Sequence, residues 1–103
     1  MGNFVKVANK ADLLPGTCIS AEADGLPIAL FNVNGEIHAT DNACAHQGGP
    51  LGEGFLEDKV VTCPWHGWQF DVTTGANMAS PEITIPKYNV KVEGYDILVE
   101  IDS

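Results

Sequence analysis

Apolar and polar residues alternate with a period of two along much of the chain, which is typical of half-buried β-strands. Val5 and Val7 follow this pattern near the N-terminus, and Ile97, Val99 and Ile101 follow it near the C-terminus. The patterned stretches are short, and turn residues separate them roughly every ten positions. The sequence therefore predicts an all-β protein, an antiparallel β sandwich or open barrel.

The same pattern places the individual strands. Strands are expected at residues 18–23, 28–33, 36–41, 60–61, 68–72, 88–92 and 97–101. Asn34-Gly35 predicts a type I′ hairpin, since both residues accept a positive φ. Asn9 is expected to cap one helical turn over residues 10–14. In strand 36–41, Ile37 faces the core and His38 the solvent.

Two irregular loops interrupt the pattern, and each carries one cysteine and one histidine. Residues 42–56 are rich in glycine and contain Cys44-Ala45-His46, while the second loop contains Cys63-Pro64-Trp65-His66. Thiolates and imidazoles are metal ligands, and two such pairs can close on one site. A third loop, residues 77–82, contains Pro81.

The pairing of ligand types favours one metal group over another. A zinc site with two cysteines and two histidines usually takes Cys from one segment and His from the other. Here each loop offers one of each, which suits a two-iron cluster with thiolates on one iron and imidazoles on the other. Gly48, Gly49 and Gly67 would let the backbone approach the bridging sulfides. The sequence thus predicts a Rieske-type [2Fe–2S] cluster, with zinc as the alternative.

The segments CAHQGGPLGEG at 44–54 and CPWHGWQFDVTTG at 63–75 resemble the Rieske ferredoxin family. The resemblance covers the whole chain and implies a single domain over residues 1–103. Its cluster-binding loops, about 43–54 and 63–70, would lie at one tip, with the Pro81 loop covering the cluster.

The same resemblance assigns the ligands. It implies that Cys44 and Cys63 hold the inner iron of one [2Fe–2S] cluster, and that His46 and His66 hold the outer iron.

The resemblance also bears on the reduction potential. High-potential members of the family join their loops by a disulfide, at positions that correspond here to Gly49 and Trp65. They also place Ser and Tyr hydroxyls near the cluster, where this chain has Trp68 and Phe70, which have no O–H to donate. Fewer hydrogen bonds to sulfur stabilise the reduced state less. The expected potential is therefore near the low end of Rieske centres, about −150 mV.

The chain looks like the stand-alone ferredoxins of aromatic-ring dioxygenase systems. That likeness implies a soluble electron carrier that is not itself an enzyme. It would take electrons from a flavin-dependent ferredoxin reductase and pass them to a terminal oxygenase. Direct oxygenase chemistry would need a further iron site with two histidines and a carboxylate, and only His38 remains after the cluster ligands are assigned.

Charge and composition limit the partners. The net charge of −9 argues against nucleic acid and against an anionic membrane surface. It is compatible with encounters with a basic patch on another protein and equally with a role in solubility alone. The sequence shows neither a signal peptide nor a membrane span, so a cytoplasmic monomer is expected. Three cysteines in such a protein argue against a disulfide framework, and Cys18 is expected to be a small apolar residue of the core.

Two other functions remain open at this point. The small Rieske subunit of a nitrite reductase has a similar size. A structural zinc module that binds a protein partner would use the same four ligands without sulfide.

Overall fold

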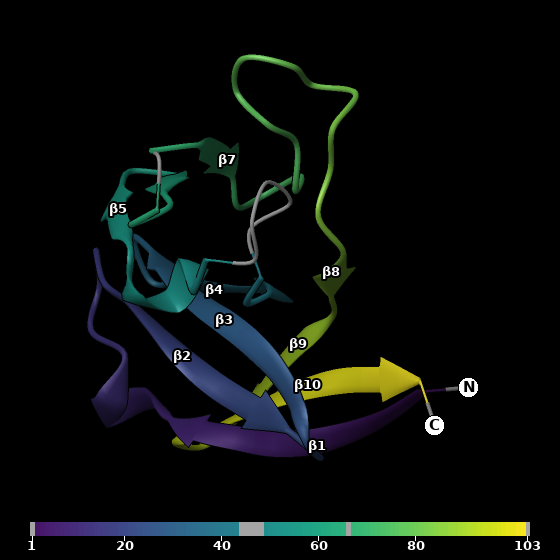
Figure 1. The fold of residues 1–103 in the computed structure, drawn as a ribbon. Helices are drawn as coiled ribbons and strands as arrows, with labels where there is room; N and C mark the ends of the chain where they lie inside the picture. The colour runs from purple at the N-terminus through teal and green to yellow at the C-terminus, as the bar shows by residue number, and fades with distance from the viewer. Residues whose placement is uncertain (1, 44–48, 66, 103) are drawn as a thin grey trace.

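The computed structural model describes residues 2–43, 49–65 and 67–102, which form three antiparallel sheets (Figure 1). The first sheet has the order β1-β10-β9, the second β2-β3-β4-β8 and the third β5-β6-β7. The strands are β1 (Gly2–Asn9), β2 (Cys18–Ala23), β3 (Leu26–Val33), β4 (Glu36–Asp41), β5 (Phe55–Glu57), β6 (Val60–Thr62), β7 (Gln69–Asp71), β8 (Lys87–Tyr88), β9 (Val90–Glu93) and β10 (Asp96–Asp102). Two short 3₁₀ helices, η1 (Lys10–Asp12) and η2 (Leu51–Glu53), accompany them. The expected all-β antiparallel fold is confirmed.

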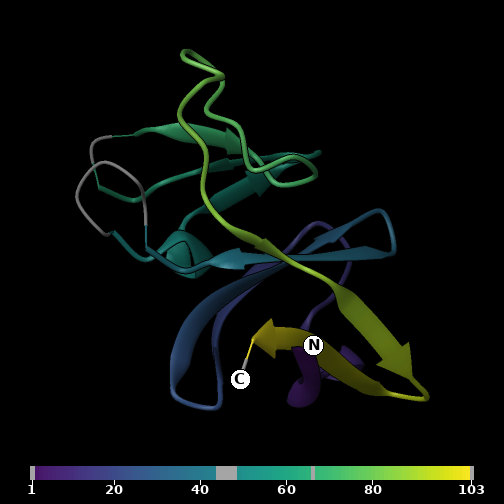
Figure 2. The ribbon, with the colours of Figure 1, turned by 90° about the vertical axis from the view of Figure 1, so that its right-hand side faces the viewer.

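The sheet β2-β3-β4-β8 lies between the other two (Figure 2), and a separate hydrophobic core packs on each of its faces. The cluster-side core lies toward β5-β6-β7 and comprises Ala29, Phe31, Leu51, Val61, Cys63, Phe70, Val72 and Ile85. The distal core lies toward β1-β10-β9 and comprises Leu13, Ala23, Ile28, Leu30, Ala39, Ile97, Val99 and Ile101. Successive residues of β3 therefore alternate between two cores, because side chains on a strand point to opposite faces in turn.

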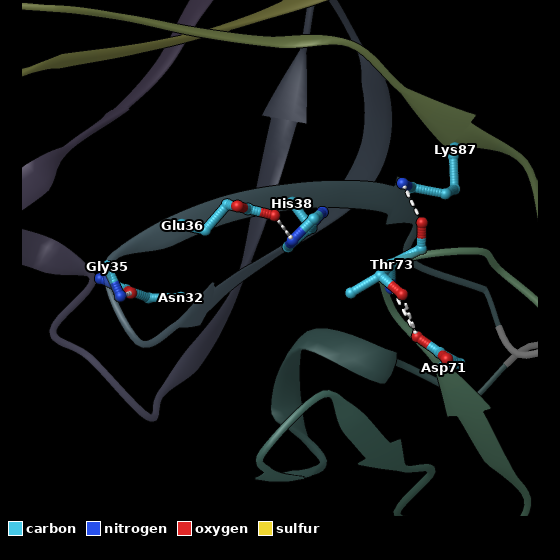
Figure 3. A network of polar contacts seen from close by, with 7 residues as sticks. All are labelled: Asn32, Gly35, Glu36, His38, Asp71, Thr73 and Lys87. Atoms are coloured by element: carbon cyan, nitrogen blue, oxygen red, sulfur yellow. Dashed lines mark hydrogen bonds and ion pairs between the residues drawn. The ribbon is translucent and has the colours of Figure 1, made fainter.

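The turns form where the sequence predicts them. Asn34 and Gly35 have φ values of 53° and 96°, as a type I′ turn requires. Asn32 supports this hairpin, since its Oδ1 accepts from the Gly35 N–H at 2.7 Å (Figure 3). Asn9 caps η1, which ends at Asp12 and is shorter than expected. β2 and β4 have the expected bounds, while β3 begins two residues earlier, at Leu26.

The prediction that His38 is solvated is wrong. Its side chain is 13% exposed, and its Nε2 lies 2.7 Å from Oε1 of Glu36 (Figure 3). Thr40, which shares that face of β4, is fully buried. The alternation correctly placed Ile37 and Ala39 on the face toward the distal core. However, β4 belongs to the middle sheet, so its opposite face, with His38 and Thr40, is covered as well. His38 pairs across the strands with Phe31 of the cluster-side core.

The described residues contain no helix long and apolar enough to cross a membrane.

Candidate metal centre

Cys63 directly follows β6 and begins a tight loop. Its backbone N–H donates to the carbonyl of Trp68 at 2.7 Å, which closes the loop before β7. Gly67 adopts a φ of 74° within this turn. The Cys63 side chain is 2% exposed, and its Sγ accepts a hydrogen bond from the Trp65 N–H at 3.4 Å. A buried sulfur that accepts a backbone N–H has the surroundings of a metal-bound thiolate.

The first loop leaves β4 and returns to η2 beside its own starting point. Ala43 and Pro50 form an isolated antiparallel bridge, and the Leu51 N–H donates to the Asn42 carbonyl at 2.7 Å. Gly49 lies just inside this bridge. The base of the loop is therefore fixed by backbone pairing on both sides.

The two loops meet at Cys63. A Cβ atom placed on Gly49 would lie 2.8 Å from Sγ of Cys63 and 2.9 Å from Cγ of Trp65. Only glycine fits this contact without a shift of the neighbours. Gly49 and Trp65, which the resemblance matches to the disulfide positions of high-potential Rieske proteins, are thus neighbours in space.

Three of the four predicted ligands, Cys44, His46 and His66, lie outside the described residues, as does Gly48. Among the residues that are described, no group of three metal-ligating side chains occurs. What the structure does show fits a cluster: a buried cysteine sulfur with an N–H donor, against a glycine of the opposite loop.

Two aromatic side chains lie behind the second loop. Phe70 is fully buried, and Trp68 is half-buried with its ring centre 6.4 Å from that of Phe70. Trp65 is 48% exposed.

Cys18 of β2 is half-buried rather than fully buried in the core, and burial raises the pKa of its thiol.

The loop that contains Pro81 packs beside the second metal-binding loop. The Met78 N–H donates to the Gln69 carbonyl at 2.9 Å, and Asn77 Oδ1 accepts from the backbone N–H groups of Ala79 and Ser80. A groove between the two loops is lined by Gly67, Trp68, Gln69, Met78, Ser80 and Ile83. Pro81 itself is exposed.

Asp71 anchors the turn that leads from β7 toward this loop. Its Oδ1 accepts from the backbone N–H of Thr73 at 2.8 Å and from the Thr73 hydroxyl at 2.6 Å, and Lys59 Nζ lies 3.5 Å from Oδ2. Lys87 of β8 donates to the Thr73 carbonyl (Figure 3). Sequence reasoning missed Asp71, although Asp followed two residues later by Thr after a strand is a turn-forming pattern.

The pKa of Asp71 follows from this network. Burial alone would raise it, but the two hydrogen bonds from Thr73 and the Lys59 ammonium outweigh burial and hold the pKa below its usual value. A carboxylate with a depressed folded-state pKa stabilises the fold above its unfolded pKa, and that stability is lost as the pH falls through the folded value.

We therefore expect Asp71→Asn to destabilise the folded protein by about 1–3 kcal/mol at pH 7. The difference from the wild-type protein should shrink once the pH falls below about 4, the ordinary pKa of Asp. Thermal unfolding of the cluster-loaded protein between pH 8 and pH 3 measures it. Asp24→Asn, at an exposed turn position, is the matched control and should have little effect. A difference in stability between the wild-type protein and Asp71→Asn that stays constant down to pH 3 would contradict the lowered pKa of Asp71.

Comparison with known proteins identifies the family of this chain. The Rieske [2Fe–2S] domain family matches residues 3–89. The ferredoxin component of the naphthalene 1,2-dioxygenase/salicylate 5-hydroxylase systems of Ralstonia sp. is 36% identical over 101 residues, which cover 97% of each chain. The biphenyl 2,3-dioxygenase ferredoxin component of Rhodococcus jostii (strain RHA1) is 40% identical over 101 residues, covering 97% of this chain and 94% of the relative.

Solved structures agree. A chain from the complex of reduced oxygenase and oxidized ferredoxin in carbazole 1,9a-dioxygenase superimposes with a TM-score of 0.84 at 33% identity, covering 93% of this chain and 91% of that one. A nitrite reductase small subunit from Mycobacterium tuberculosis superimposes with a TM-score of 0.87 at 22% identity, covering 100% of this chain and 98% of that one, a likeness that shows the fold alone. By its matched family, its fold and its relatives, this chain belongs to the Rieske [2Fe–2S] family and uses one [2Fe–2S] cluster.

Proposed function

We propose that this chain is the ferredoxin component of an aromatic-ring dioxygenase system and carries single electrons. The observation that carries the proposal is the meeting of two Cys/His loops at Cys63, in a chain similar along nearly its whole length to named ferredoxin components. Those relatives are electron-transfer proteins, so this chain performs no substrate chemistry of its own.

The ligand set we propose is Cys44, His46, Cys63 and His66, within a single domain over residues 1–103 and on loops of about 43–54 and 63–70. The two thiolates would bind one iron and the two imidazoles the other. When bound, such a cluster gains and loses one electron at a time. The chain would shield and orient it through Cys63, which is buried and whose sulfur accepts from the Trp65 N–H.

The decisive experiment is a spectrum and a metal count. The purified protein should be brown-red and contain about two irons and two labile sulfides. A colourless protein with zinc and no sulfide would instead support the structural zinc module. Cys63→Ser should lose or alter the cluster spectrum. Cys18→Ser, the same exchange at a half-buried cysteine outside the proposed ligand set, should leave the cluster spectrum unchanged, because the Cys18 sulfur lies against the backbone carbonyls of Leu51 and Gly54.

The reduction potential is expected near the low end of Rieske centres, about −150 mV. No side-chain hydroxyl is available from Trp68 or Phe70. Phe70→Tyr should therefore raise the midpoint potential, because a hydroxyl bonded to a cluster sulfur stabilises the reduced state. Phe55→Tyr, at a side chain that is 72% exposed, is the matched control and should leave the potential unchanged. A wild-type midpoint well above zero in a redox titration would overturn the expectation.

The partners we propose are a flavin-dependent ferredoxin reductase and a terminal oxygenase, each bound transiently by a cytoplasmic monomer. Support for the oxygenase comes from the related ferredoxin solved in complex with its oxygenase. The net charge of −9 would speed encounters with basic docking surfaces. A role as a nitrite reductase small subunit has weaker support, since that likeness extends to the fold only.

A further inference from the structure

Asn42 occupies the junction between β4 and the first cluster loop, and it touches three other parts of the chain. Its backbone N–H donates to the Pro27 carbonyl of β3 at 3.3 Å, and its own carbonyl accepts from Leu51 of η2 at 2.7 Å. Its side-chain Oδ1 accepts from the Gly52 N–H at 2.8 Å and from the Ser20 hydroxyl of β2 at 3.3 Å. One residue thus joins β2, β3 and η2.

These bonds hold both ends of the loop. Asn42 precedes Ala43, Leu51 follows Pro50, and Ala43 pairs with Pro50 in the isolated bridge. The bonds from Asn42 to Leu51 and Gly52 therefore fix the two ends of segment 43–50 against each other. Cys44 follows Ala43 directly in the sequence, so a clamped residue is its covalent neighbour.

The far end of the loop cannot slide to compensate. A Cβ atom on Gly52 would lie 2.5 Å from three backbone atoms of Ile19 and Ser20. Cys18 Sγ lies 4.0 Å from the Leu51 carbonyl and 3.6 Å from the Gly54 carbonyl, so the start of η2 and the residue after it also contact β2. Because contacts with β2 hold the C-terminal end of the loop, the position of its N-terminal end depends on the hydrogen bonds of Asn42.

We infer that Asn42 is a positioning residue for the [2Fe–2S] cluster: its side-chain carbonyl, bound by Gly52 and Ser20, sets the base of the first cluster loop and through it Cys44 and His46. The inference rests on the proposed function, since it takes those two residues as ligands. Residues that orient ligands without touching the metal change metal retention by about 10- to 100-fold when they are replaced.

Asn42→Ala removes the acceptor of both side-chain bonds. The holo-protein should then release iron to a chelator about 10- to 100-fold faster than the wild-type protein, with a changed EPR spectrum of the reduced state. Asn42→Asp keeps an oxygen acceptor at the same place and should restore slow release. Asn89→Ala is the matched control. The exposed Asn89 donates to the side chain of Glu100 at 2.8 Å, outside the loops, so its loss should leave iron release and EPR unchanged.

The readouts separate positioning from general stability. A lower unfolding temperature for Asn42→Ala, with iron release and EPR equal to wild type, would overturn the inference. If Asn42→Ala is not recovered folded, Ser20→Ala decides, because it removes the 3.3 Å bond alone: faster release supports the inference and unchanged release overturns it. A wild-type protein with zinc and no sulfide would instead defeat the proposed function, which is a distinguishable result.

Discussion

Gly49→Ala is expected to deprive the protein of most of its cluster while leaving the strands folded. The new methyl group would lie 2.8 Å from Sγ of Cys63 and 2.9 Å from Cγ of Trp65, closer than unstrained carbon contacts. The Trp65 side chain is 48% exposed and can swing outward, whereas the Cys63 sulfur is buried and fixed by its loop. The strain therefore falls on the predicted ligand.

The cost of such overpacking is about 1–3 kcal/mol, which corresponds to iron binding that is weaker by roughly 5- to 150-fold. Iron and sulfide content after purification and the rate of iron release measure it. A double variant, Gly49→Ala with Trp65→Ala, removes the ring from the collision. If the contact with the sulfur dominates, as we expect, the double variant remains poor in iron.

Gly94→Ala is the control for stability alone. Gly94 has a φ of 63° in the β9–β10 turn, and a Cβ there meets nothing within 4 Å. The substitution should cost about 1 kcal/mol in backbone strain and leave the cluster content unchanged. Full cluster retention in Gly49→Ala would show that the two loops do not meet as the structure places them.

The elements that depend on local pattern were predictable from the sequence. The bounds of β2 and β4 follow from the period-two alternation, and the φ values of Asn34 and Gly35 follow from the residue types themselves. The candidate ligands could be named because few residue types bind metals. Their exact pairing in space could not, since the contact of Gly49 with Cys63 joins segments distant in the chain.

Other features were missed because they depend on what lies across a sheet. His38 and Thr40 are shielded because both faces of β4 are covered. The alternating pattern shows which face of a strand is apolar, but not whether the polar face is covered by another part of the protein or exposed to solvent. Asn42 is one polar residue among several at a strand end, and its role becomes visible only when Gly52 and Ser20 are seen to bond its side chain.

The two hydrophobic cores differ in their relation to the cluster loops. The distal core ties β1, β9 and β10 to the middle sheet, and none of the described residues of either cluster loop belongs to it. The cluster-side core includes Leu51 of the first loop and Cys63 of the second. A change in the packing of this core should therefore also shift the candidate ligands. Losses of packing in the two cores should therefore have different consequences for the cluster.

Leu51→Ala and Leu30→Ala test this difference with the same chemical change. Both side chains are fully buried, Leu51 in the cluster-side core and Leu30 in the distal core. Each truncation should lower the free energy of unfolding by about 2–5 kcal/mol, through lost burial and the cavity left behind. That is a large share of the 5–15 kcal/mol that is usual for a domain, so both variants should unfold at lower temperature.

The cluster should respond to one truncation and not the other. Leu51 begins η2, and its N–H bonds the Asn42 carbonyl, so a cavity there loosens the base of the first loop. We expect Leu51→Ala to release iron about ten-fold faster or more at a temperature where both variants are folded, and Leu30→Ala to release it at nearly the wild-type rate. Equal acceleration in both variants would show that cluster retention tracks global stability, and that the cluster-side core does not place the ligands.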